Sequence, residues 1–357
     1  MKRTTPMKRT TVTRRKALAG FGSLAAASPL IADHPPKLIG EPPGRIAPRV
    51  DLVNVLEFEN MAERKLAPDV FAAIAGSDRS FFDRITFRPR MMAPTNHLDL
   101  TVQLFGEKMF APVMVGPMAR LQNYHPDGEA GMARAASAAK AWMVVSSESS
   151  VPVEKIAAES KTTLWYQVFP EEDVTGVREK MDRAVKAGCK AICITVGAPL
   201  PKTTVRPAVN WTKVDQMRKG IGVPVLMKGV LTPQEAGAAM KHGMDGIVVS
   251  NYGGLLTPGM ASSMEMLPSI MDAVGGKAPV LIDGNFRRGS DIFKALAYGA
   301  SAVMLGRPVV WGLAAYGPEG AQQVLEMLQT EVARDMAHCG RPTIKDIDGA
   351  VIKLHEA

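Results

Sequence analysis

The chain has 357 residues, 46% of them apolar and 22% charged, which is the composition of a soluble protein with a large core. Its formal net charge is +8, but residues 1–32 hold seven lysines and arginines and no acidic residue, so the remaining 36 basic and 35 acidic residues nearly balance. That balance argues against a nucleic-acid partner. Three cysteines without CxxC spacing and six scattered histidines argue against a disulfide framework and a zinc site, and we expect no metal.

The first residues have the order of an export signal. A basic stretch leads to Arg14-Arg15, then to a short apolar run over 17–27 that ends in three alanines. This order is typical of a twin-arginine signal peptide cleaved after about Ala27, which predicts a periplasmic or other extracytoplasmic location. The apolar run is too short and too rich in small residues for a stable membrane span. A disordered basic tail on a cytoplasmic protein is the alternative.

A Pro-rich stretch follows the leader, so we expect a signal peptide over 1–32, a linker over 33–49 and a single domain over 50–357. Within the domain, residues 50–110 should contribute a helix over Val53–Leu66 and irregular segments that pack across one end of the fold.

From Pro112 onward, short β-branched runs alternate with stretches of helical character. The runs are Pro112–Met118, Ala141–Ser147, Thr163–Phe169, Ala191–Gly197, Pro224–Val230, Gly246–Tyr252, Pro279–Asn285 and Ala302–Pro308. Strands that are apolar on both faces and separated by helices predict the α/β class, as a (β/α)8 TIM barrel with an N-terminal helical extension. An open doubly wound sheet is the alternative, weakened because no GxGxxG follows any run.

Local signals bound several of the intervening helices. Thr232-Pro233 and Ser290 are expected helix starts, and Gly243 and Gly299 are expected ends. The stretch Pro318–Cys339 predicts a last amphipathic helix, and Cys193 should lie in the core.

Active sites of such barrels lie at the carboxyl ends of the strands. The residues there are rich in hydrogen-bonding groups and cations: Ser146, Gln167, Thr195, Lys228, Ser250, Asn251, Tyr252, Asp283, Asn285, Arg287 and Arg307. Such a set suits a phosphorylated cofactor with a polar ring system.

Several long stretches resemble the FMN-dependent α-hydroxy-acid oxidase and dehydrogenase family, which includes glycolate and lactate oxidases. They are HPDGEAGMARAAS, VPVLMKGVLTPQEA, GIVVSNYGG, LIDGNFRRGSDIFKALAYGA and VMLGRPVVWGLAAYGPEG. The resemblance spans about residues 50–350 and implies an FMN cofactor. It also implies FMN contacts at Pro117, Met118, Ala119, Ser146, Gln167, Thr195, Lys228, Ser250, Asp283, Gly284, Asn285, Arg287, Gly306 and Arg307.

The resemblance implies specific roles for two parts of this set. Lys228 would place a fixed cation where reduced flavin becomes negative; a barrel lysine paired with a carboxylate is the alternative. Glycines and guanidinium groups after the last two strands would hold the phosphate. Asn285 stands where the family normally has a second glycine, and Arg288 should point to solvent or to a neighbour.

The substrate side departs from the family pattern. Tyr252 stands where the resemblance expects the proton-accepting histidine, Leu255 where it expects the carboxylate-binding arginine, and Gly197 where it expects the aspartate that orients the histidine. Phe169 replaces an expected tyrosine, and Asp69–Gly76 offers no counterpart of an N-terminal one. A tyrosine of pKa ~10 in place of a histidine of ~6.5 weakens proton acceptance by about 5 kcal/mol.

The stretch Ala198–Val223 is also shorter than the family's usual insertion, which predicts a more open flavin face rimmed by Phe169, Leu255, Leu256 and Trp211. Lys202 and Arg206 in this stretch are either solvated loop charges or a replacement cation.

Three functions therefore remain open. The first is an FMN-dependent oxidoreductase acting on a CH–OH or related donor that is larger or less polar than a small 2-hydroxy acid, with Tyr252 and Lys228 as catalytic residues. The second is a non-catalytic FMN-binding ligand or interaction protein, and the third is a residual α-hydroxy-acid dehydrogenase. The expected partners are a small-molecule substrate and an electron acceptor, either oxygen, a quinone or a periplasmic protein. The resemblance also implies a homo-oligomer, commonly a tetramer.

Overall fold

The computed structural model describes residues 46–90, 92–197, 209–252 and 261–356. The predicted leader, most of the linker, Lys202, Arg206, Leu255 and Leu256 lie outside these residues. Among the described residues, the long helices lack the unbroken apolar stretch that crossing a bilayer would require.

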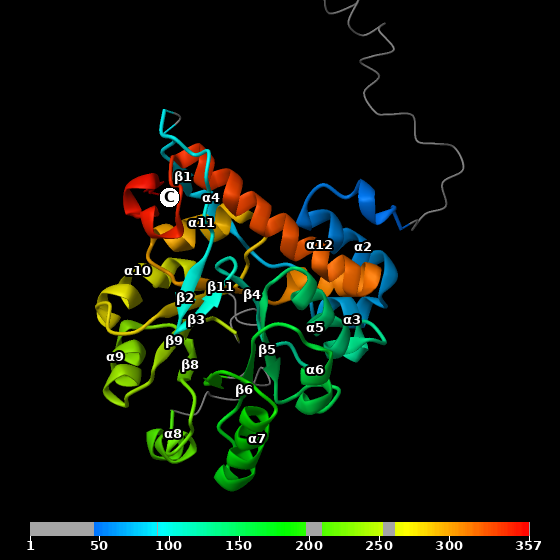
Figure 1. Cartoon of the computed structure of the whole chain (residues 1–357), viewed down its shortest axis with the longest axis vertical. Coiled ribbons are helices and arrows are strands. Elements are labelled where there is room, and N and C mark those ends of the chain that lie inside the picture. Colours follow the sequence, from blue (N-terminus) through cyan, green and yellow to red (C-terminus); the bar gives the residue numbers. More distant parts are fainter. Residues whose placement is uncertain (1–45, 91, 198–208, 253–260, 357) are drawn as a thin grey trace, which may run out of the picture. The chain divides into compact units, whose positions relative to one another are not determined.

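Eight parallel strands close into a barrel in chain order, as the sequence predicts (Figure 1). They are β4 (Val113–Val115), β5 (Trp142–Ser146), β6 (Leu164–Val168), β7 (Ile192–Thr195), β8 (Val225–Val230), β9 (Gly246–Val249), β10 (Val280–Asp283) and β11 (Ala302–Leu305). Seven of the eight predicted runs extend past the observed strand at the carboxyl end, because their last residues leave the ladder to form the loops that build the site; the exception is Pro224–Val230, which ends with β8.

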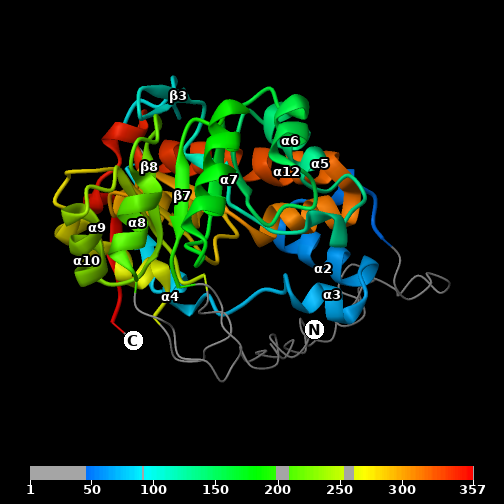
Figure 2. The same cartoon turned by 90° about the horizontal axis from the view of Figure 1, so that it is seen from below.

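Helices surround the barrel (Figures 1 and 2). They are α5 (Gly128–Ala138), α6 (Val153–Glu159), α7 (Val174–Lys186), α8 (Trp211–Arg218), α9 (Pro233–Lys241), α10 (Ser263–Val274), α11 (Gly289–Ala297) and α12 (Arg307–Cys339). Short 3-10 helices lie at Arg49–Asp51, Leu121–Asn123, Ile344–Asp346 and Gly349–Val351.

The strands bury side chains on both faces, which explains their continuous apolar runs. In β4, Met114 belongs to the barrel interior, whereas Val113 and Val115 belong to the core beneath the helices. The interior is closed at one end by the antiparallel hairpin of β2 (Val102–Leu104) and β3 (Glu107–Met109), whose Leu104 and Met109 join the interior cluster. This hairpin leaves the opposite end available for the site.

The N-terminal extension is helical, as expected. It contains α2 (Val55–Lys65), α3 (Pro68–Ala72) and α4 (Ser80–Asp83), and α2 packs against α12 (Figures 1 and 2). The strand after α4, β1 (Ile85–Phe87), pairs with β12 (Ile352–Leu354), so this extension is joined to the C-terminal end of the domain. Asn54 caps the N-terminus of α2, because its side chain accepts hydrogen bonds from two amides of the first turn.

The starts of α9 and α11 lie at or next to the predicted residues. Thr232 caps α9 with a capping box, as predicted, whereas α11 begins at Gly289, one residue before the predicted Ser290. The Asp291 carboxylate accepts from the amides of Arg287 and Arg288, which fixes the earlier start. The predicted last helix, Pro318–Cys339, is confirmed as the second part of α12: non-helical backbone at Tyr316 and Gly317 separates it from a preceding helical part that begins at Arg307.

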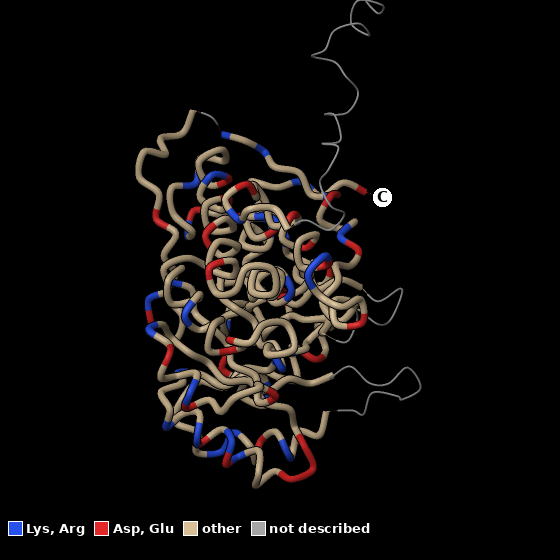
Figure 3. The backbone as a smooth tube through the Cα atoms, turned by 90° about the vertical axis from the view of Figure 1, so that its right-hand side faces the viewer, with Lys and Arg blue, Asp and Glu red and all other residues tan. Residues whose placement is uncertain are grey.

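All three cysteines are buried and unpaired, and Cys193 lies in the barrel interior as predicted. Acidic and basic residues are interspersed along the described surface helices (Figure 3).

Candidate active site

A row of buried polar side chains runs along the carboxyl ends of neighbouring strands. Ser146 and Gln167 are register partners whose side chains bond at 3.0 Å, and Thr195 is the register partner of Lys228. Lys228, only 2% exposed, donates to Ser250 Oγ at 3.1 Å. Buried polar groups normally have partners, but Gln167 Nε2 and Thr195 Oγ1 have none among the described residues.

Lys228 also forms an ion pair with Asp283, with 2.7 Å between Nζ and Oδ2. The sequence left open whether this lysine pairs with a carboxylate or serves a cofactor, and the geometry allows both, because Lys228 and Asp283 line the same cleft. The backbone beside it depends on Gly229: a Cβ there would lie 2.1 Å from the carbonyl oxygen of Val196. Glycine thus allows the irregular register that follows Lys228 on β8.

A cleft lies at the carboxyl ends of β4, β8, β9, β10 and β11. It is lined by Ala73, Gly116, Pro117, Met118, Lys228, Asn251, Tyr252, Asp283, Gly284, Asn285, Phe286, Arg287, Met304, Leu305, Gly306, Arg307 and Pro308.

Nine of the fourteen predicted cofactor residues line this cleft: Pro117, Met118, Lys228, Asp283, Gly284, Asn285, Arg287, Gly306 and Arg307. Ser146, Gln167, Thr195 and Ser250 belong instead to the buried polar row beside Lys228. Ala119 is not among the lining residues.

One end of the cleft is strongly cationic. Arg287 is 1% exposed, its guanidinium lies 4.5 Å from the ring centroid of Trp311, and its Nη2 has no hydrogen-bond partner in the part of the chain that the structure describes. Burial, followed by the nearby Arg307, lowers the pKa of Arg287 to about 9, because both destabilise the charged form. Burial also lowers the pKa of Arg307. Two buried guanidinium groups with a free donor form a site that an anion would stabilise.

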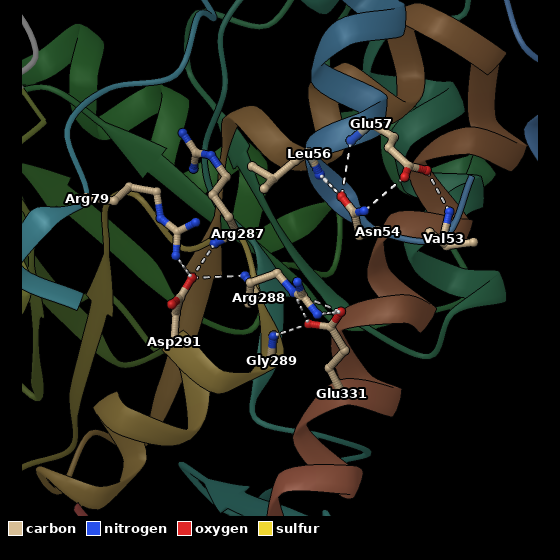
Figure 4. Close-up of polar contacts among 10 residues, drawn as sticks. All are labelled: Val53, Asn54, Leu56, Glu57, Arg79, Arg287, Arg288, Gly289, Asp291 and Glu331. Carbon is tan, nitrogen blue, oxygen red and sulfur yellow. Dashed lines mark hydrogen bonds and ion pairs between the residues drawn. The ribbon is translucent and has the colours of Figure 1, made fainter. Parts of the chain in front are cut away.

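Neighbouring contacts hold this end in place (Figure 4). Asp291 accepts from the Arg287 amide at 2.8 Å and pairs with Arg79 at 2.6 Å, while the Arg287 side chain extends away from it. Arg288 turns instead to Glu331 on α12 at 3.0 Å, which confirms the expectation that it points to a neighbour. Position 289 has no room for a side chain beside this pair, since a Cβ at Gly289 would lie 2.3 Å from Glu331 Cβ.

The other end of the cleft is aromatic. Tyr252 is 38% exposed, with its ring centroid 6.2 Å from that of Phe169 and 5.2 Å from Lys228 Nζ. Burial first, then Glu148 and Asp283, raise the pKa of Tyr252, so the phenol is protonated at neutral pH. No histidine lines the described part of the cleft.

Two findings were not predicted. Trp211, expected at the rim, stacks on His242 with 4.3 Å between ring centroids, so it joins α8 to α9 on the outside of the barrel. Conversely, Ala73 lines the cleft, and Trp311 Nε1 bonds the carbonyl of Ile74 at 2.8 Å. No local pattern signalled that this N-terminal segment would meet the ends of β10 and β11.

Comparison with known proteins identifies the class. The model for FMN-dependent dehydrogenases matches residues 73–204 and 199–354. L-lactate oxidase from Nostoc sp. is 34% identical over 85% of this chain and 98% of its own, and glycolate oxidase from Spinacia oleracea is 32% identical over 84% and 95%. A mandelate oxidase structure solved with 2-hydroxy-phenylacetamide superposes with a TM-score of 0.80 at 34% identity, over 86% of this chain and all of that one.

The chain therefore belongs to the FMN-dependent dehydrogenase family. It is an FMN-dependent oxidoreductase, and FMN is its cofactor. The residues present fit that group: a buried guanidinium with a free donor suits a phosphate, and unpartnered polar atoms beside Lys228 suit a ring system with polar edges.

Proposed function

We propose that the substrate of this oxidoreductase is larger or less polar than a small 2-hydroxy acid. The observation that carries the proposal is the aromatic mouth formed by Tyr252 and Phe169 next to Lys228, at the position where the sequence resemblance expects an acid–base histidine. A pair of aromatic rings favours contact with apolar or aromatic surface. Neither ring carries a charge that could bind a substrate carboxylate.

Tyr252 would act as a hydrogen-bond donor or proton relay to the substrate oxygen rather than as a strong base, because burial keeps its phenol protonated. Lys228 would hold a positive charge at a fixed place, since Asp283 and Ser250 orient its ammonium group. FMN, when bound, supplies the two-electron acceptor for oxidation of the donor.

In this assignment the cationic end holds the FMN phosphate through Gly284, Asn285, Arg287, Gly306 and Arg307. Pro117, Met118 and Ala119 lie against the ring system. Ser146, Gln167, Thr195, Lys228, Ser250 and Asp283 serve its polar edges.

Oxidation of an ordinary 2-hydroxy acid is the second candidate. Its support is the 34% identity to an L-lactate oxidase across nearly the whole of that protein. It requires another group to accept the substrate proton, and the Asp283 carboxylate in the cleft is already paired with Lys228. That pairing makes the second candidate the weaker one.

A ligand-binding series tests the proposal. Binding would be followed by the perturbation of the FMN absorption band, comparing lactate and glycolate with uncharged aryl-substituted alcohols. We expect the aryl compounds to bind more tightly, and Phe169→Ala to weaken them by about tenfold through the lost aromatic contact. Phe110→Ala, at an exposed ring that contacts Lys140, is the matched control and should change nothing. Tighter binding of lactate and glycolate would contradict the proposal.

We also propose twin-arginine export of the folded protein, motivated by Arg14-Arg15 and the apolar run that follows. Replacing both arginines by lysine should leave the precursor in the cytoplasm in a fractionation experiment. Export of this variant to the periplasm at the wild-type level would contradict the proposal.

Assembly as a homo-oligomer is a further proposal, from the family resemblance. Light scattering of the purified protein measures its oligomeric state.

A further inference from the structure

Asn285, in the loop after β10, has a backbone conformation that favours glycine. Its φ is 61°, in the left-handed region that few non-glycine residues adopt, although asparagine tolerates it better than most. The family resemblance expects glycine at this position. An unfavoured residue at such a place calls for a compensating interaction of its side chain.

Both ends of the Asn285 amide are in fact engaged. Its Oδ1 accepts from Ser77 Oγ at 2.6 Å and from Arg307 Nη2, and its Nδ2 donates to the carbonyl oxygen of Asp78 at 2.7 Å. Arg307 completes the network, because its Nη1 donates to the carbonyl oxygen of Ala75 at 2.9 Å and to Ser77 Oγ at 3.3 Å. Asn285 therefore joins Arg307 to the N-terminal segment Ala75–Asp78.

This segment borders the cationic end of the cleft. Ala73, directly before it, lines the cleft together with Asn285 and Arg307. The segment is tied at its other side by Trp311, which bonds Ile74, and by Glu59, which accepts from the Gly76 amide at 2.5 Å. The Asn285 contacts are thus the ties that connect the segment to the loop after β10.

We infer that Asn285 acts as a clasp: it holds the segment Ala75–Asp78 and Arg307 together beside the phosphate end of the cofactor site and thereby slows the release of FMN. The inference rests on the cofactor site assigned in the proposed function. Asn285 is in this respect a positioning residue, whose amide acts through Arg307 and through the segment. Slow release suits a protein that receives its cofactor once, before export.

The experiment measures FMN dissociation from the holoenzyme by the recovery of flavin fluorescence on dilution. Asn285→Gly should release FMN about tenfold faster, the effect of losing hydrogen bonds to a charged group. Its melting temperature without FMN should be unchanged or higher, because glycine adopts a positive φ without strain. A merely structural role would instead lower the melting temperature and FMN retention together.

Lys140→Gly is the matched control. Lys140 also has a positive φ, 53°, but it follows α5 and is exposed. The control should gain the same backbone relief and keep the wild-type dissociation rate. Ser77→Ala removes one contact of the clasp without altering the backbone at position 285, and should give a smaller acceleration in the same direction.

Unchanged dissociation in both Asn285→Gly and Ser77→Ala would overturn the inference, as would equal acceleration in Lys140→Gly. These outcomes are separate from those that test the substrate: tight binding of lactate would contradict the proposed function and leave the relative dissociation rates as they are.

Discussion

The two ends of the cleft differ in how they are built. The cationic end is closed: Arg287 is 1% exposed, and Asp291, Trp311 and the Asn285 contacts fix its surroundings. The aromatic end is more open, with Tyr252 38% exposed and, within the described residues, in ring contact with Phe169 and Lys228. Buried charge demands a specific anion, whereas a half-exposed ring tolerates many partners. In the proposed assignment, the cofactor end is therefore the constrained part of this site, and the substrate end is the part free to diverge.

Removing the buried cation should break the constrained end most severely. Arg287→Met is expected to weaken FMN binding about 1000-fold, the loss of a buried charge-assisted contact of about 4 kcal/mol. The protein without FMN should be equally or more stable, because a buried charge without a bonded carboxylate is costly. Titration with FMN and thermal melting measure both effects. Arg288→Met, at the outward pair with Glu331, should keep wild-type FMN affinity; equal losses in the two variants would contradict the assignment.

The second-largest effect is expected from the ion pair of Lys228 and Asp283, which lies between the two ends of the cleft. Lys228→Met leaves the Asp283 carboxylate without its partner at 2.7 Å, and the free energy of unfolding should fall by about 3 kcal/mol. Chemical denaturation measures this change. Lys180→Met breaks an exposed pair of 2.9 Å with Glu171 and should cost less than about 1 kcal/mol. Similar losses of unfolding free energy in the two variants would show that burial of Lys228 does not strengthen its ion pair.

Removing the phenol oxygen of Tyr252 at the open end should lower turnover and leave FMN binding unchanged. Tyr252→Phe keeps the ring contacts and deletes the phenol, so turnover of any donor that reduces the wild-type protein should fall about 100-fold, as for loss of one catalytic hydrogen-bond donor. FMN content should stay at the wild-type level. Steady-state kinetics and the absorption spectrum test the two halves, and full activity would remove Tyr252 from the mechanism.

The smallest expected effect lies outside the cleft. Burial, followed by Glu331, raises the pKa of Asp335 from 3.8 to about 6. The unfolded chain therefore binds fewer protons than the folded protein between these values, and the free energy of unfolding falls as pH rises from about 4 to about 6. Asp335→Asn should raise stability at pH 7 by about 1 kcal/mol, after discounting for solvent screening, and much less at pH 4. Melting curves at both pH values check this difference, and an equal gain at pH 4 would contradict the cause.

The sequence predicted the barrel well because its strands are buried on both faces and read as continuous apolar runs. It also predicted which residues meet at the cationic end, since Asp283, Gly284, Gly306 and Arg307 lie at the carboxyl ends of two of those runs, Arg287 follows shortly after, and all five line one cleft.

Long-range packing was beyond the sequence. Ser77 meets Asn285 from 208 positions away, and no periodicity relates the two residues. Trp211 was placed at the rim because it belongs to the short stretch Ala198–Val223 between two strands, but stacking on His242 fixes it on the outer helices. The start of α11 was misplaced because the capping carboxylate, Asp291, lies inside the helix rather than before it.

The most direct test of the divergent substrate end is anaerobic reduction. The purified protein with bound FMN would be mixed with glycolate, lactate and mandelate without oxygen while the flavin band near about 450 nm is followed, a general property of oxidised flavin. We predict a yellow protein that glycolate and lactate do not bleach. Rapid bleaching by either would show that Tyr252 and its neighbours support ordinary hydroxy-acid oxidation, and would contradict the account.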